Sequence, residues 1–155
     1  MAEKTSAQVP FPERHRQMLS FYLDRELYGF EIKYILQVIE PPPFAFVPRA
    51  PFFLRGAVNY RGKVIAVIDL GQFMGGKEKP LNPESRIIII DSPEFNLGFL
   101  VERVERIETV PVFGEMVQQP PEANPYISGV VNLGGRLFNI IDLEKLLKEI
   151  ESYFS

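Results

Sequence analysis

The chain has 155 residues, with 17 basic and 20 acidic side chains, a formal net charge of −3 and no cysteine. This length suits one domain with a sizeable core, and the acidic balance argues against nucleic acid as a partner. The lack of cysteine excludes disulfides, thiol nucleophiles and cysteine-ligated zinc, and no apolar run is long enough to insert into a membrane, so we expect a cytoplasmic protein.

Residues 1–17 are polar and have no apolar periodicity, which predicts a flexible N-terminal tail before a single domain at 18–155. Leu19, Phe21 and Leu23 then alternate with polar residues, the period of a half-buried strand. A second alternating stretch follows a turn near residue 25, and prolines between 41 and 51 interrupt the pattern. The opening of the domain is therefore predicted to be β-structure followed by a loop.

The stretch 56–74 returns 73 residues later as 129–147, with seven of nineteen positions identical. Average residue usage gives roughly one identity by chance. The pattern of each copy predicts a strand, a turn and a buried strand. A shorter repeat, in which both copies begin with Gly-Phe, relates 29–38 to 98–107. Two copies with this period predict two similar supersecondary units packed as a pair.

A glycine- and proline-containing stretch near 75–85 is the predicted linker between the two halves. Leu143, Leu146 and Ile150 lie on one face of a predicted C-terminal helix, with Asp142 as its N-cap. Short strands at regular spacing, with many prolines and glycines, favour small barrels over alternating α/β units. The predicted fold class is mainly β, in two interdependent halves, because each half alone would be only marginally stable.

Several repeated polar and glycine positions are interpreted as structural, serving turns or helix caps. They are Asn59, Gly62, Asp69, Asn132, Gly135 and Asp142. An aspartic dyad of Asp69 and Asp142 is the alternative, but the Asp-Thr/Ser-Gly turn of that chemistry is missing. The single histidine, His15, falls in the predicted tail, so we expect no catalytic residues, no metal site and no cofactor.

Arg61 differs from its repeated frame, because the second copy has Gly134 there. The arginine is therefore not needed to build the turn, and an exposed guanidinium on a rigid barrel suits docking to a carboxylate or carbonyl group. An ordinary solvated arginine is the other interpretation. Four phenylalanines between 44 and 53 are expected to cover a barrel end, with one or two left as an apolar docking patch.

These motifs together resemble the CheW family, the coupling proteins of bacterial chemotaxis. The matching segments are Val-Pro-Arg-Ala-Pro at 47–51, Gly-Ala-Val-Asn-Tyr-Arg-Gly at 56–62 and Val-Ile-Asp-Leu at 67–70, supported by 28–32 and 98–104. Two positions depart from the family pattern. Tyr60 replaces a usual leucine, which puts partner choice in question, and Ala66 replaces a common proline.

The resemblance implies two SH3-like five-stranded β-barrel subdomains around a shared core, with short helices including one at the C-terminus. It implies a non-enzymatic adaptor that joins the regulatory domain of a CheA-type histidine kinase to the cytoplasmic tip of chemoreceptors, recruited to membrane-associated receptor arrays. By matching positions, the receptor groove would use Ile35, Gln37, Gly56 and Arg61. The alternative function is a small β-barrel module outside chemotaxis that binds peptides or nucleic acid.

Overall fold

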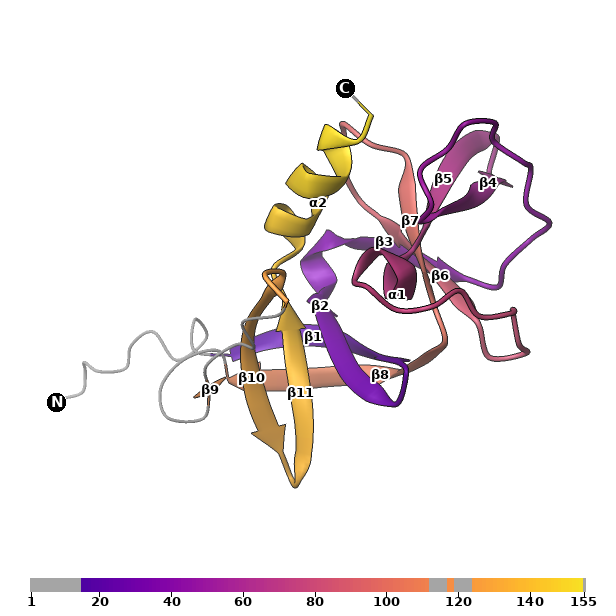
Figure 1. The fold of residues 1–155 in the computed structure, drawn as a ribbon. Coiled ribbons are helices and arrows are strands. Elements are labelled where there is room, and N and C mark those ends of the chain that lie inside the picture. The colour runs from indigo at the N-terminus through magenta and orange to yellow at the C-terminus, as the bar shows by residue number, and fades with distance from the viewer. Residues whose placement is uncertain (1–14, 112–116, 119–123, 155) are drawn as a thin grey trace, which may run out of the picture.

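The computed structural model describes residues 15–111, 117–118 and 124–154 (Figure 1). One sheet, here called the first barrel, contains β3 (Ile35–Ile39), β4 (Leu54–Tyr60), β5 (Lys63–Asp69), β6 (Arg86–Ile90) and β7 (Leu97–Val101). The other, the second barrel, contains β1 (His15–Leu23), β2 (Glu26–Glu31), β8 (Arg103–Pro111), β9 (Val117–Gln118), β10 (Ile127–Leu133) and β11 (Arg136–Ile141). The helical elements are the 3-10 turn η3 (Ile32–Tyr34), α1 (Leu70–Phe73) and α2 (Leu143–Ser152).

The two barrels share one strand order. The first runs β3-β6-β7-β5-β4 and the second runs β8-β1-β2-β11-β10, with the short β9 added at its edge. Each contains one parallel pair at the same place, β5 with β7 and β11 with β2. The predicted fold class, mainly β with two five-stranded SH3-like subdomains and a C-terminal helix, is confirmed.

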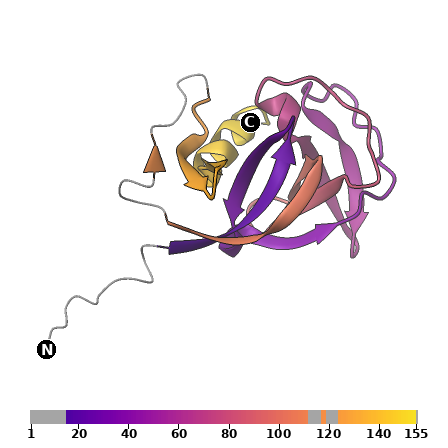
Figure 2. The same cartoon turned by 90° about the horizontal axis from the view of Figure 1, so that it is seen from below.

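The predicted linker near 75–85 is wrong as a boundary between the halves, because it joins α1 to β6 within the first barrel. The chain crosses between barrels at η3 and again at Glu102. Parallel strands cannot be joined by a tight turn, so each barrel is closed by a further hairpin. That hairpin is the next one along the chain in the first barrel and comes from the other end of the domain in the second. The β1–β2 hairpin therefore completes the second barrel, and β6–β7 completes the first; β1 and β2 lie between β10–β11 and the first barrel in Figure 2.

The predicted tail also ends earlier in the structure than at residue 17. β1 begins at His15, because residues 15–17 pair with Pro111, Val110 and Thr109 of β8. The remainder of the predicted tail, residues 1–14, lies outside the described residues. Among the residues that the structure describes, no helix is both long and apolar enough to cross a membrane.

The hydrophobic core has three parts. One cluster, around Val67 and Ile87, fills the first barrel, and another, around Val131 and Phe138, fills the second. The largest cluster lies between the barrels and also buries Leu70 of α1 and Leu146 of α2. Burying this apolar surface between the barrels makes their folding interdependent.

The repeated Gly-Phe motif lies at the centre of the shared core. Phe30 of β2 and Phe99 of β7 are both fully buried, and their ring centroids lie 5.3 Å apart. Gly29 and Gly98 precede them, and a Cβ atom at either position would collide with a side chain inside its own barrel, Phe138 or Ile87. The repeated Gly-Phe pair therefore leaves room for one barrel interior and contributes a ring to the common core.

Candidate functional site

The turn between β4 and β5 is a two-residue hairpin loop formed by Arg61 and Gly62, with φ of 52° and 81°. Asn59 Oδ1 accepts a hydrogen bond from Gly62 N–H at 3.2 Å. The second copy repeats this arrangement, with Asn132 Oδ1 accepting from Gly135 N–H at 2.7 Å. Positive φ at both central residues matches the right-handed twist of a hairpin and explains why Gly recurs in both turns, whereas Asn recurs as the side-chain acceptor.

Arg61 is held in a conformation that its side chain disfavours. A left-handed backbone costs an L-residue other than glycine about 1 kcal/mol or more. The side chain is exposed, its Cζ lies 5.2 Å from the centroid of the Tyr60 ring, and no carboxylate among the described residues forms an ion pair with it. The turn therefore presents an uncompensated guanidinium to solvent.

A surface hollow of about 290 Å³ opens beside this turn, at the mouth of the first barrel. Arg61 and Lys63 line it from the β4–β5 hairpin, and Gln37 lines it from β3. Ile65 and Ile89 are buried beneath it, whereas Leu36 is 54% exposed. The hollow thus combines two cations, the Asp91 carboxylate, an amide and apolar surface, a composition typical of a protein-docking site.

Two of the four residues predicted at the receptor groove lie outside this hollow. Ile35 is half-buried and packs against the shared core. Gly56 is buried in β4 with φ of 147°, and a Cβ there would lie 2.8 Å from the carbonyl oxygen of Ala45. Glycine at this position therefore permits close backbone packing, and the partner contact of Gly56 stays a prediction.

Among the lining residues absent from the predicted groove, Leu36, Lys63 and Phe95 are the most informative. Lys63 directly follows the Arg-Gly turn, so its place beside Arg61 was available from the hairpin pattern. Leu36 looks like a core residue of β3, and only the register shift between Ile35 and Gln37 turns it outward. Phe95 comes from the β6–β7 loop, whose position no local pattern indicates.

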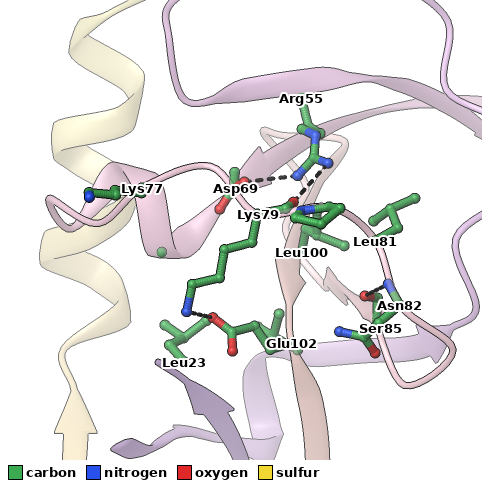
Figure 3. A pocket seen from close by; sticks show the side chains of 13 residues that line it. Leu23, Arg55, Asp69, Lys77, Lys79, Leu81, Asn82, Ser85, Leu100 and Glu102 are labelled. Carbon is green, nitrogen blue, oxygen red and sulfur yellow. Dashed lines mark hydrogen bonds and ion pairs between the residues drawn. The ribbon is translucent and has the colours of Figure 1, made fainter. Parts of the chain in front are cut away.

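Asp69 and Asp142 each serve the helix that follows them. Asp69 accepts from Gln72 N–H at 3.2 Å and pairs with Arg55 Nη1 at 3.0 Å (Figure 3). Asp142 accepts from Lys145 N–H at 3.1 Å. Burial is the largest influence on Asp69 and raises the pKa of its carboxyl, although the Gln72 and Arg55 hydrogen bonds act in the opposite direction. The two carboxylates belong to different barrels, and each is occupied as an N-cap.

The segment 75–85 ties the two barrels together. Lys79 Nζ lies 3.0 Å from Asp24 Oδ1 and 3.2 Å from Glu102 Oε2, and Glu102 also accepts from Asp24 N–H at 3.0 Å. Figure 3 shows Lys79 reaching toward Glu102 beside the Arg55–Asp69 pair. The space between these groups is about 30 Å³, enough for one water, so this polar cluster is a structural bridge.

Of the four phenylalanines in the loop before β4, two pack against the protein interior and two are exposed at the surface, as the sequence predicts. Phe53 is fully buried, and Phe44 packs against the interior of the first barrel. Phe46 is 87% exposed and Phe52 is 66% exposed.

Comparison with known proteins identifies the family. Residues 17–151 match the family model described as the CheW-like domain. The chain belongs to this family. It is 28% identical over 144 residues to "Chemotaxis protein CheW" of Treponema pallidum, an alignment covering 87% of this chain and 84% of that protein.

Other CheW-like proteins show the same similarity along most of the domain. "Chemotaxis protein CheW" of Thermotoga maritima is 28% identical over 135 residues, with 86% of this chain and 89% of that protein aligned. "Protein FrzA" of Myxococcus xanthus is 26% identical over 126 residues, covering 77% and 78%. The crystal structure of the scaffolding protein TtCheW from Thermoanaerobacter tengcongensis superposes with a TM-score of 0.70 at 28% identity, covering 81% of this chain and 88% of that one.

Proposed function

We propose that this CheW-like protein is a non-enzymatic adaptor that couples chemoreceptors to a CheA-type histidine kinase. The observation that carries the proposal is Arg61, which is kept unpaired and left-handed at the rim of a docking hollow where the second repeat has glycine. Its CheW relatives are named chemotaxis proteins, and TtCheW is a scaffolding protein. A rigid frame with one costly charged residue is the arrangement expected of an interface anchor.

The hollow at the mouth of the first barrel would receive the cytoplasmic tip of the receptor. Arg61 would donate to a carboxylate or to carbonyl groups of the tip, and Gln37 would add a polar contact. Leu36 would supply the apolar part, since more than half of its surface is open to solvent. The regulatory domain of the kinase would bind elsewhere, leaving the hollow free, and the adaptor would be recruited from the cytoplasm to the receptor array.

A non-enzymatic role agrees with the structural use of the two candidate catalytic carboxylates. Asp69 and Asp142, the residues of the alternative hydrolytic reading, are each engaged as a helix cap, and Asp69 is also paired with Arg55. The structure thus gives both carboxylates a structural role as helix caps. Function then resides in surface contacts that bring two other proteins together.

Pull-down of two separate partners tests the proposal. Arg61→Glu should weaken capture of a receptor cytoplasmic fragment by roughly 30-fold, because a desolvated arginine anchor is worth about 2 kcal/mol. Capture of the kinase regulatory domain should be unchanged. Lys77→Glu makes the same charge change on an exposed residue outside the hollow and should bind both partners normally. Equal binding of both partners by Arg61→Glu would remove Arg61 from the site.

A further inference from the structure

The Arg61 turn differs from its repeat at two adjacent positions. Tyr60 and Arg61 align with Leu133 and Gly134 of the second turn, whereas the Asn and Gly residues on either side are shared. The backbone is left-handed at Arg61 and at Gly134 alike, with φ of 52° and 58°. The turn that carries the arginine therefore has an aromatic residue directly before it, and the turn without the arginine has a leucine there.

Packing alone does not require an aromatic ring at this position. Tyr60 is half-buried and packs against the interior cluster of the first barrel, and Leu133 packs against that of the second barrel in the same way. A leucine thus fills the equivalent place beneath an equivalent turn. What tyrosine adds is an aromatic face, and Tyr60 lines the hollow together with Arg61.

The Tyr60 ring supports the Arg61 guanidinium. Arg61 Cζ lies 5.2 Å from the ring centroid, which is within the range of cation–π attraction. Asp91 lines the same hollow but forms no ion pair with Arg61. Because packing fixes the ring, this contact restricts an otherwise free side chain. A guanidinium over a ring keeps its N–H donors in its own plane, where a partner can accept them.

A second arginine–tyrosine contact in the chain is of a different kind. Arg103 Cζ lies 4.3 Å from the centroid of the Tyr22 ring, but Arg103 Nη1 also donates to Glu105 Oε1 at 2.8 Å. The charge of Arg103 is therefore used within the fold. Arg61 has the ring contact without the carboxylate, so its donors are held in place and still free.

We propose that Tyr60 is a positioning residue, which holds the Arg61 guanidinium in the hollow so that its donors face the receptor tip. This role rests on the proposed coupling function. An arginine side chain loses rotamer freedom when it is fixed in an interface, and a ring that restricts it beforehand reduces that loss. Removing the ring should therefore weaken receptor binding although Arg61 and its turn remain.

Proton NMR of the free full-length protein tests the positioning step without any partner. The ring current of Tyr60 should move the Hδ and Hε resonances of Arg61 upfield. Tyr60→Phe should keep this shift, and Tyr60→Leu should abolish it. Tyr22→Leu is the control, in which the Arg103 resonances should move and those of Arg61 should stay. An Arg61 shift that is unchanged in Tyr60→Leu would overturn the inference.

Calorimetric titration with a receptor cytoplasmic fragment tests the consequence for binding. Tyr60→Leu should raise the Kd about fivefold, whereas Tyr60→Phe should bind like the wild type. Tyr60→Leu should also unfold at nearly the wild-type urea concentration, because Leu133 shows that the equivalent position accommodates leucine. A wild-type Kd for Tyr60→Leu, or an equal loss in Tyr60→Phe, would overturn the role of the ring.

Arg61→Glu, measured in the same titration, separates this inference from the proposed function. If Arg61→Glu loses the fragment and Tyr60→Leu does not, only the positioning role is refuted. If Arg61→Glu binds as tightly as the wild type, the receptor site at Arg61 is refuted, and the role of Tyr60 with it.

Discussion

Arg61 and Gly134 occupy the same position in two equivalent turns, and both have a left-handed backbone, with φ of 52° and 58°. The second turn has the residue that this geometry favours, whereas the first keeps an arginine at a conformational cost. Natural proteins retain such local costs chiefly where function needs the side chain. Because both turns belong to one chain and have the same backbone geometry, the Gly134 turn is a direct reference for the cost of Arg61.

Exchanging the two residues should move stability in opposite directions. Arg61→Gly should raise the free energy of unfolding by about 0.5–1 kcal/mol, because glycine adopts φ near 50° without a Cβ penalty. Gly134→Arg should lower it by a similar amount. Urea denaturation measures both changes, and a destabilised Arg61→Gly would show that the arginine contributes to the fold after all.

The two turn asparagines provide a matched pair. Asn59→Ala and Asn132→Ala each remove one side chain to backbone hydrogen bond, to Gly62 and Gly135 respectively, and each should cost about 1 kcal/mol. Only Asn59→Ala should also weaken receptor-fragment binding, because only its turn carries Arg61. Similar binding losses in both variants would point to a general effect of stability.

The repeat in the sequence was enough to predict the paired hairpins, their Asn and Gly turns and the caps at Asp69 and Asp142. It could not predict how the strands divide between the two sheets, because β1 and β2 join β8–β11 from the other end of the chain. Each barrel also closes through a parallel pair that no local pattern indicates. The sequence placed Arg61 and Gln37 at one site through family resemblance. Phe95 was not predicted, because it reaches the hollow from the β6–β7 loop, which is far in sequence from the β4–β5 turn.

The contact between Phe30 and Phe99 makes the barrels interdependent. Phe30→Ala or Phe99→Ala should cost about 3–5 kcal/mol, the usual loss for a fully buried phenylalanine. Because the rings belong to different barrels, unfolding followed by circular dichroism and by tyrosine fluorescence should remain a single coincident transition in the wild type. Two separate transitions would show that each barrel folds alone.

The buried cap of α1 should give an unusual pH dependence. The ordinary carboxyl pKa is 3.8, and burial raises the pKa of Asp69 above it. The folded protein then retains this proton at a pH where the unfolded chain has released it, so the contribution of Asp69 to stability falls as pH rises from 3.8 through the raised pKa. Asp69→Asn keeps an N-cap acceptor and lacks the titration.

The quantity to measure is the difference in unfolding free energy between wild type and Asp69→Asn, followed by urea denaturation at a series of pH values from about 3 to 7. It should decline with rising pH and then level off. A difference that grows with pH would mean that the Arg55 ion pair outweighs burial and holds the pKa of Asp69 below its ordinary value.

Calorimetric titration of a receptor cytoplasmic fragment into wild type and Arg61→Gly tests the role of the strained arginine most directly. The predicted result is a Kd about 30-fold weaker for Arg61→Gly, in a protein whose unfolding free energy is equal to or greater than that of the wild type. A variant that binds the fragment as tightly as the wild type would contradict the claim that Arg61 is retained for the partner.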